Sequence, residues 1–183
     1  MSEQSDPSAT VTSEANGAIE VCDDNHVVLR FRRRLAYPPQ RVWAALTEPA
    51  QLAGWWGDAE IDLTVGGAFV VRWRNTDADG NTATIHHTIT QLEPSRLLET
   101  AGDLHGVLRW ELTPDGPGTV LAFSSTVVLP GQYRSMVLAG WHWHLDGLAA
   151  SLGGTPADLE GLTGWTEVHE RYADPRARTS PFS

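Results

Sequence analysis

The sequence lacks several features, and each absence excludes a class of protein. Cys22 is its single cysteine, which excludes a disulfide framework and a thiolate metal site. It has no lysine: all 13 basic residues are arginine, against 23 acidic residues, and the formal net charge is −10. A phosphate backbone would repel such a chain, so we expect no nucleic-acid partner. An anionic membrane surface would repel it for the same reason.

Long apolar runs and known catalytic motifs are also missing. The longest uncharged run, 116–133, is interrupted by turn residues and hydroxyls, so we predict no membrane span. The polar, acidic N-terminus is unlike a signal peptide and favours a cytoplasmic protein. The sequence contains no nucleophile elbow, phosphate-binding glycine loop or His-x-x-x-His pair, so we predict no catalytic residue, no bound metal and no cofactor.

The residues that are present predict an α+β fold with one domain over 17–155. Two apolar runs on either side of a turn at 23–25 predict a hairpin, followed by a helix with proline in its first turn and a short helix at 50–56. Short β-type runs separated by Gly, Pro, Asp and Asn then predict an antiparallel meander over 59–129. Residues 1–16 are predicted to be a disordered tail and 176–183 a flexible one.

The stretch Trp-His-Trp-His-Leu at 141–145 alternates like a strand, and on a strand His142 and His144 would share a face. The surrounding segment 132–154, however, is rich in Leu and Ala and too long for a typical strand. We therefore predict a long helix, on which the two histidines lie about 200° apart and cannot hold one metal ion. Its apolar stripe is Leu138, Trp141, Leu145, Leu148 and Leu152.

A further helix is predicted within 156–175. Trp165, Val168 and Tyr172 would form its apolar side. So short a helix is stable only when it packs on a larger body. We expect it to dock on the domain and cover Trp143 and Met136, which lie opposite the leucine stripe of the long helix.

This order of elements resembles the START-like, helix-grip superfamily, also called SRPBCC. The resemblance is to the branch of homologues of the C-terminal domain of the activator of the heat-shock chaperone ATPase. It rests on 29–56 (LRFRRRLAYPPQRVWAALTEPAQLAGWW), 66–69, 89–98 (ITQLEPSRLL), 118–125 (GTVLAFSS) and 139–154 (AGWHWHLDGLAASLGG). It implies a curved antiparallel sheet, with two short N-terminal helices, wrapped around a long C-terminal helix. It also implies a cavity for an apolar or amphipathic molecule, with Ser125 where the family commonly has histidine.

Period-two alternation in the strands and helical spacing identify the residues expected to line that cavity. Arg33 would either anchor a ligand carboxylate or phosphate, or form a structural pair with Glu99 or Glu111. His87 and His142 would either contact the ligand or be hydrogen-bonded core groups. The tryptophans would form either a ligand box or simply the core. The predicted cavity residues are Phe31, Arg33, Phe69, Val71, Trp73, His87, Trp110, Phe123, Ser125, Trp141, His142 and Leu145.

Three functions stay open at this point. We expect a carrier or sensor that binds an apolar or aromatic small molecule, as a monomer or homodimer. The alternatives are a chaperone cofactor or interaction protein, as the family name implies, and an enzyme with few polar groups, of the cyclase or hydrolase type.

Overall fold

The computed structural model describes residues 16–77 and 79–173. The tail predicted at 1–16 lies outside the described residues except for residue 16, and the tail predicted at 176–183 lies entirely outside them. The described strands are β1 (Ala18–Val21), β2 (His26–Leu35), β3 (Asp58–Ile61), β4 (Ala68–Thr76), β5 (Thr82–Glu93), β6 (Leu97–Gly102), β7 (Gly106–Asp115) and β8 (Gly118–Val128). The described helices are α1 (Pro39–Thr47), α2 (Pro49–Leu52), the 3₁₀ turn η2 (Gly131–Tyr133), α3 (Arg134–Leu152) and α4 (Trp165–Ala173).

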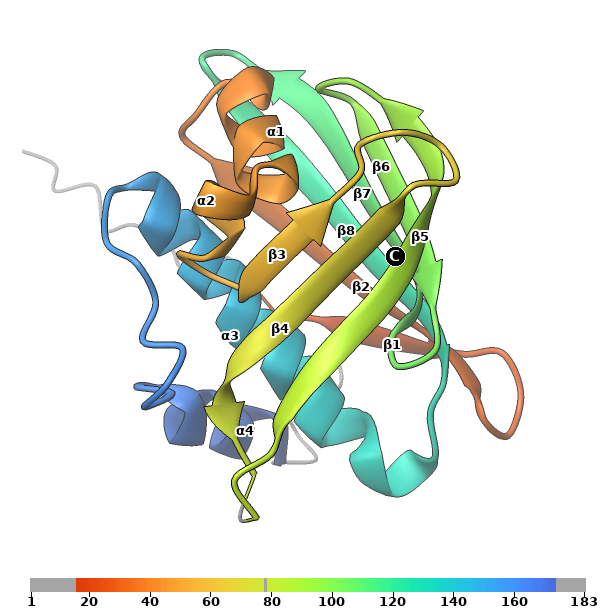
Figure 1. Ribbon diagram of the computed structural model, residues 1–183. Helices are drawn as coiled ribbons and strands as arrows, with labels where there is room; N and C mark the ends of the chain where they lie inside the picture. Colours follow the sequence, from red (N-terminus) through yellow and green to blue (C-terminus); the bar gives the residue numbers. More distant parts are fainter. Residues whose placement is uncertain (1–15, 78, 174–183) are drawn as a thin grey trace, which may run out of the picture.

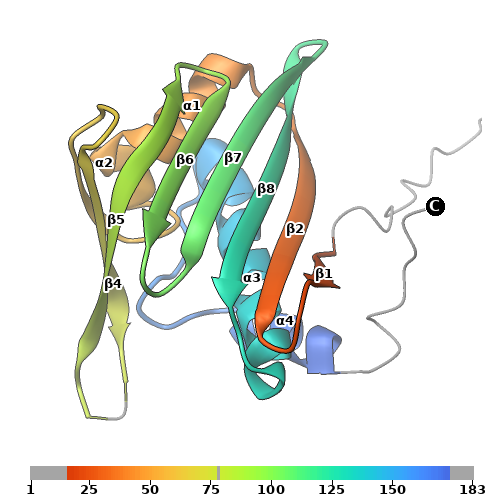
Figure 2. The same cartoon turned by 90° about the vertical axis from the view of Figure 1, so that its right-hand side faces the viewer.

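The strands form one antiparallel sheet in the order β1-β2-β8-β7-β6-β5-β4-β3. The sheet curves around α3, while α1 and α2 cover one end of its concave side (Figure 1). Figure 2 shows the outer face of the sheet, with α3 behind it. The predicted α+β helix-grip fold, with its curved sheet, two short helices and long C-terminal helix, is confirmed.

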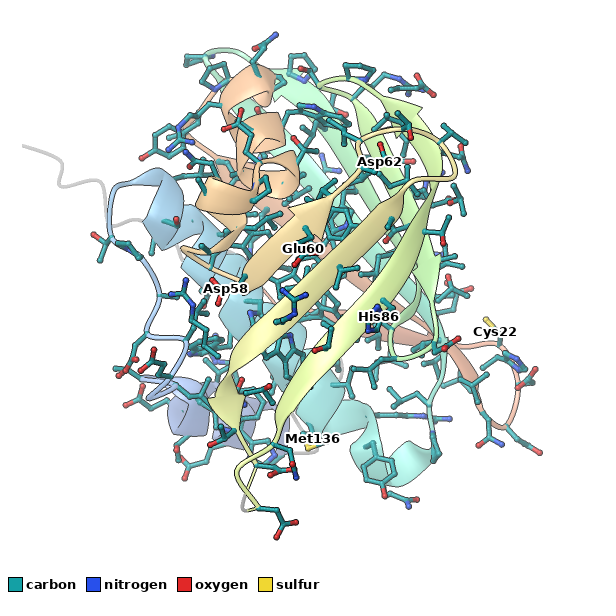
Figure 3. All side chains as sticks on the ribbon, in the orientation of Figure 1. Cys22, Asp58, Glu60, Asp62, His86 and Met136 are labelled. Atoms are coloured by element: carbon teal, nitrogen blue, oxygen red, sulfur yellow. The ribbon has the colours of Figure 1, made fainter. Side chains whose placement is uncertain are left out.

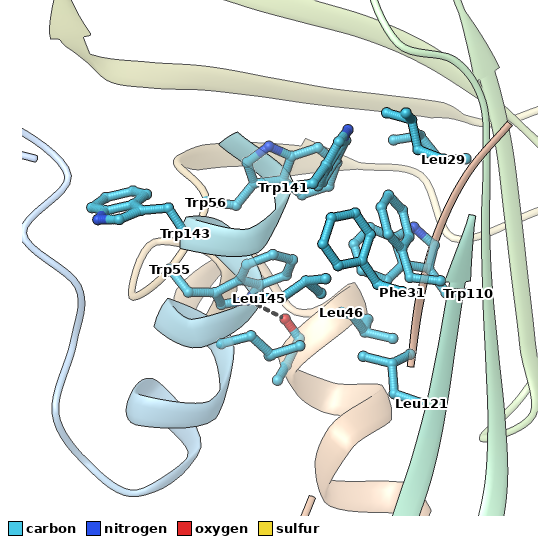
Figure 4. Packing of buried hydrophobic residues seen from close by; sticks show 14 of the residues in the cluster. Leu29, Phe31, Leu46, Trp55, Trp56, Trp110, Leu121, Trp141, Trp143 and Leu145 are labelled. Atoms are coloured by element: carbon cyan, nitrogen blue, oxygen red, sulfur yellow. Dashed lines mark hydrogen bonds between the residues drawn. The ribbon is translucent and has the colours of Figure 1, made fainter. Parts of the chain in front are cut away.

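Alternation along each strand sends apolar side chains toward α3. In β2 the buried residues occur at every second position, among them Leu29 and Phe31, and they face the helix side of the sheet. The α1–α2 corner is joined to the core by the indole of Trp55, whose Nε1 donates to the carbonyl of Ala45 at 2.9 Å. Figure 4 shows this corner beside Trp56, Trp141 and the aromatic side chains of the sheet.

The long helix is buried on two sides. One side carries the predicted leucine stripe, whose members are each at most 5% exposed. On the other side α4 packs against it through Val168 and Tyr172, and Trp143 Nε1 donates to the carbonyl of Thr163 at 2.9 Å. Trp143 points away from the aromatic cluster toward that segment (Figure 4). Met136 remains 47% exposed, so the expectation that α4 covers it is wrong.

Membrane insertion through a helix has no structural support in the described part of the chain. Across residues 16–77 and 79–173, none of the helices combines the length and the hydropathy that a membrane crossing requires.

Candidate functional site

A pocket of about 610 Å³ lies between the sheet and the first half of α3. The ends of β4, β5 and β8 form one wall, and α3 forms the opposite wall through Val137, Gly140 and Trp141. A third wall comes from the segment between α3 and α4, through Leu159 and Leu162. The volume lies within the range that small-molecule sites usually have.

The mouth of the pocket is rimmed by exposed apolar side chains. Leu104, Val128, Tyr133 and Met136 all line the pocket, yet each keeps between 46% and 58% of its surface exposed. Met136, in the first turn of α3, is labelled in Figure 3. Because exposed apolar side chains gathered at one place often mark a binding surface, this rim indicates where an apolar molecule would enter.

The inner end of the pocket is made of closely packed aromatic rings. The imidazole of His105, in the turn between β6 and β7, lies 5.0 Å from the ring of Trp141, 6.0 Å from Trp73 and 6.5 Å from Trp56, measured between ring centroids. The ring centroid of His144, on α3, lies 6.1 Å from that of Trp73 on β4. Rings at these separations pack in the tilted arrangements that aromatic groups favour.

Burial keeps the histidines of this region neutral at physiological pH. It lowers the pKa of His105 from 6.5 to about 3, and the neighbouring His87 and His144 lower it further. Burial also lowers the pKa of His144 to about 4, although its hydrogen bond to the Trp55 carbonyl opposes the shift. Burial likewise lowers the pKa of His87 to about 4, although the negative charge of Asp103 opposes the shift. A charged imidazole is disfavoured here because the surrounding rings do not solvate it.

The described residues offer no recognisable metal centre. No group of three or more His, Cys, Asp or Glu side chains among residues 16–77 and 79–173 has an arrangement that could hold a metal ion. His142 and His144 lie on different sides of α3, with His142 against Tyr172 and His144 Nδ1 donating to the Trp55 carbonyl at 3.0 Å.

The structure brings only part of the predicted set to this pocket. Trp73, Ser125 and Trp141 lie on its wall, and the Ser125 hydroxyl donates to the carbonyl of His105 at 2.9 Å. His87 is buried behind the wall, with Nδ1 2.9 Å from the hydroxyl of Thr100. The remaining apolar members pack against one another and against α3 in the core, as Figure 4 shows for several of them: Phe31, Phe69, Val71, Trp110, Phe123 and Leu145.

Arg33 and His142 belong to a polar cluster on the opposite side of α3 from the pocket. His142 Nδ1 lies 2.8 Å from the hydroxyl of Tyr172, and its Nε2 lies 3.1 Å from Asp146 Oδ2. Arg33 Nη2 lies 3.5 Å from Asp146 Oδ1, and its guanidinium also sits over the ring of Phe31. Burial lowers the pKa of Arg33, and the Asp146 carboxylate opposes that effect.

The predicted glutamate partners of Arg33 are therefore wrong. Glu99 and Glu111 both bind the guanidinium of Arg109 instead, at 2.9 Å and 2.6 Å. Arg109 lies directly opposite Glu99 in the pairing of β6 with β7. Arg33 points from β2 toward α3, where Asp146 is the carboxylate within reach.

Sequence reasoning missed several pocket residues. His105 lies in a turn, where alternation does not indicate which way a side chain faces. His144 lies outside the leucine stripe of the long helix, and Trp56 follows the short helix α2, so neither has a periodic pattern that places it in the pocket. Helix geometry does give a signal for His144. His142 and His144 lie on opposite faces of a helix, so if one of them faces α4, the other must face away from α4.

The helix-grip fold and the apolar pocket between sheet and helix define a START-like protein. The chain belongs to the family described as Activator of Hsp90 ATPase homolog 1-like protein, whose model matches residues 36–153. The predicted family is thereby confirmed. A search of curated proteins found no match.

Solved structures show the same fold. A conserved protein of unknown function from Enterococcus faecalis is 23% identical, with a TM-score of 0.65 over 88% of this chain and 91% of the other. A Bordetella parapertussis protein is 22% identical, with a TM-score of 0.66 over 87% and 90%. CalU16 from Micromonospora echinospora is 24% identical, with a TM-score of 0.62 over 86% and 93%.

Proposed function

We propose that this chain binds an apolar or aromatic small molecule in the pocket between the sheet and α3, and acts as a carrier or sensor. The observation that carries the proposal is the pocket itself. It has a volume of about 610 Å³, an inner end made of aromatic rings and a rim of exposed apolar side chains. Burial of the ligand's apolar surface, at roughly 25 cal/mol per Å², would supply most of the affinity.

The histidines of the pocket favour binding over catalysis. An efficient general base at neutral pH has a pKa near 7. Burial lowers the pKa of His105 to about 3 and that of His144 to about 4, so both are weak bases. His144 also uses its Nδ1–H to donate to a backbone carbonyl, which fixes its tautomer. These groups therefore suit recognition of a ligand better than transfer of a proton.

A pocket-filling substitution tests the proposal. A Cβ atom at Gly140, which lines the pocket, would make an ordinary van der Waals contact with two ring atoms of Trp165, each 4.0 Å away, so a side chain can be added there without a clash at Cβ. Gly140→Phe should occupy the pocket and leave the backbone of α3 undisturbed. Ala150→Phe is the matched control, because it adds the same ring to an exposed position of the same helix.

The measurement is fluorescence titration with Nile red, a neutral aromatic dye, together with native mass spectrometry of freshly purified protein. We expect the wild type and Ala150→Phe to bind one equivalent of dye, and Gly140→Phe to bind at least tenfold more weakly. A co-purified small molecule should be present in the first two proteins and absent from the third. Equal dye binding by all three proteins, or no dye and no co-purified molecule in any of them, would contradict the proposal.

A further inference from the structure

Three ring nitrogens at the inner end of the pocket lack a hydrogen-bond partner. They are Nε1 of Trp56, Nε1 of Trp73 and Nδ1 of His105, each buried and without a partner among the described residues. All three residues line the pocket, and Trp56 is only 2% exposed. Buried polar groups are nearly always hydrogen-bonded, so three unpartnered ones lining one pocket require an explanation.

Two other indoles, those of Trp55 and Trp143, do have a hydrogen-bond partner. Trp55 Nε1 donates to the Ala45 carbonyl at 2.9 Å, and Trp143 Nε1 donates to the Thr163 carbonyl at 2.9 Å. Trp143 also lines the pocket, so contact with the pocket does not by itself leave an indole unpaired. The unpartnered groups instead gather around His105, whose ring lies 6.5 Å from that of Trp56 and 6.0 Å from that of Trp73.

The chemistry of these groups selects one kind of ligand atom. An indole N–H can only donate, so its partner must be an acceptor. The nearest guanidinium on the pocket wall, that of Arg74, is already held by Asp58, with Nη2 at 2.6 Å and Nε at 3.2 Å from the carboxylate. With the wall histidines neutral, an anionic ligand would lose its hydration without gaining an unpaired cation.

We propose that the ligand is a neutral, largely aromatic molecule carrying a carbonyl-type oxygen, which accepts hydrogen bonds from the indole N–H groups of Trp56 and Trp73. This inference rests on the proposed function and adds the chemical class of the ligand. The apolar rings of the pocket bury the aromatic part of the ligand. The unpartnered donors hold its oxygen at the inner end, beside His105.

A pair of probes that differ in one oxygen tests the inference. Fluorenone and fluorene share a rigid three-ring skeleton, but fluorenone has a carbonyl where fluorene has a methylene. Equilibrium dialysis of the full chain against each probe gives two dissociation constants. We expect fluorenone to bind roughly tenfold more tightly, because each net hydrogen bond contributes a factor of about two to ten. The carbonyl stretch of bound fluorenone should also move to lower frequency than in hexane.

Single substitutions then locate the donors. Trp73→Phe and Trp56→Phe should each lower the ratio of the two affinities several-fold. Trp43→Phe is the control for loss of indole volume, because Trp43 lies in α1 and is not among the residues that line the pocket, and it should leave the ratio unchanged. The comparison of probes on the wild-type protein stands even if Trp56→Phe does not fold.

The outcomes separate the inference from the proposed function. Equal binding of fluorenone and fluorene, with no shift of the carbonyl stretch, would show that water satisfies the donors and would overturn the inference while the pocket still binds aromatic molecules. Binding of neither probe would overturn the inference and the proposed function together. A preference for fluorenone that survives both Trp56→Phe and Trp73→Phe would also overturn it, because the carbonyl would then be held by other groups.

Discussion

Tyr172→Phe should destabilise the fold by about 2 kcal/mol, because the Tyr172 hydroxyl joins three parts of the chain. It accepts a hydrogen bond from the backbone N–H of Gly17 at 2.7 Å and lies 2.8 Å from His142 Nδ1. The other ring nitrogen of His142, Nε2, lies 3.1 Å from Asp146 Oδ2 and 3.3 Å from Arg171 Nη1, so both ring nitrogens have a partner. The hydroxyl therefore links the N-terminal strand and α4 to α3.

The magnitude follows from the burial of the groups left behind. His142 is 1% exposed and Tyr172 is 2% exposed, so water cannot easily replace the lost partner of His142 Nδ1. A buried donor or acceptor left unsatisfied costs about 1–3 kcal/mol. Gly17 is only half-buried, and its N–H can be hydrated, so it adds little. For a domain of this size, a loss of about 2 kcal/mol lowers Tm by roughly 4–8 °C.

The assay is urea unfolding followed by tryptophan fluorescence, with an unchanged m-value expected. Tyr133→Phe is the control: Tyr133 is 46% exposed, and removing its hydroxyl should change the free energy of unfolding by less than about 0.5 kcal/mol. His142→Phe combined with Tyr172→Phe should cost less than the sum of the two single substitutions, since both remove the same bond. A change for Tyr172→Phe as small as that of the control would refute the reasoning.

Three further predictions concern stability. The free energy of unfolding should fall as pH drops from 6.5 to 4, by up to about 3 kcal/mol per buried imidazole. The reason is that unfolded histidines bind protons near pH 6.5, whereas burial lowers the pKa of His105 to about 3 and that of His144 to about 4. Urea unfolding at several pH values measures this dependence, and His144→Gln should make it weaker whereas His86→Gln should not. Arg33→Met should change stability by no more than about 1 kcal/mol in thermal unfolding, because its partner Asp146 is half-exposed and can be hydrated; a loss of several kcal/mol would contradict this. Truncation after Gly154 should lower stability by a few kcal/mol in urea unfolding, since it removes buried side chains of α4 worth about 1.5–3 kcal/mol each, and an unchanged midpoint would show that α4 contributes nothing.

Local patterns predicted the secondary structure well, because each element carries its own period. Alternation in β2 places Leu29, Phe31 and Arg33 on the buried side, as the structure shows. The length and leucine spacing of 134–152 indicated a helix despite the local alternation of Trp-His-Trp-His, and α3 confirms it. These signals depend only on residues close together in the chain.

The position of the pocket could not be predicted in the same way. Period two gives the side of a strand on which a residue lies, but not its distance from the opposing helix. Trp110 and Phe123 do point inward, yet their rings lie 4.2 Å from each other and that of Phe123 lies 4.4 Å from Trp141, so they fill the space between sheet and helix. The pocket instead lies against the first half of α3, where residues of β4 and β5 also line it.

The partner of Arg33 depended on tertiary structure for a related reason. The sequence pattern suggested Glu99 and Glu111, on strands of the same sheet, as partners of Arg33. The Arg33 side chain points toward α3 and does not reach them. Glu99 instead meets Arg109, directly opposite it on the neighbouring strand. Cross-strand register is thus enough to explain the Glu99 pair, whereas the Arg33–Asp146 pair requires the packing of helix on sheet.

The wall that closes the pocket comes from outside the part of the chain that matches the family. The match ends at residue 153, whereas Leu159, Leu162 and Trp165 all line the pocket. Leu162 has φ = 51°, in the left-handed region that costs a residue with a side chain about 1–2 kcal/mol. The backbone N–H of Leu162 donates a hydrogen bond to the Asp158 carbonyl at 2.9 Å, which holds Leu162 in this conformation. The hydroxyl of the next residue, Thr163, donates to the Asp158 carboxylate at 2.6 Å. A segment kept in a costly conformation against the pocket shapes what the pocket accepts. Family members that share the matched region but differ after it should therefore differ in the shape of this site, and the family alone does not determine the ligand.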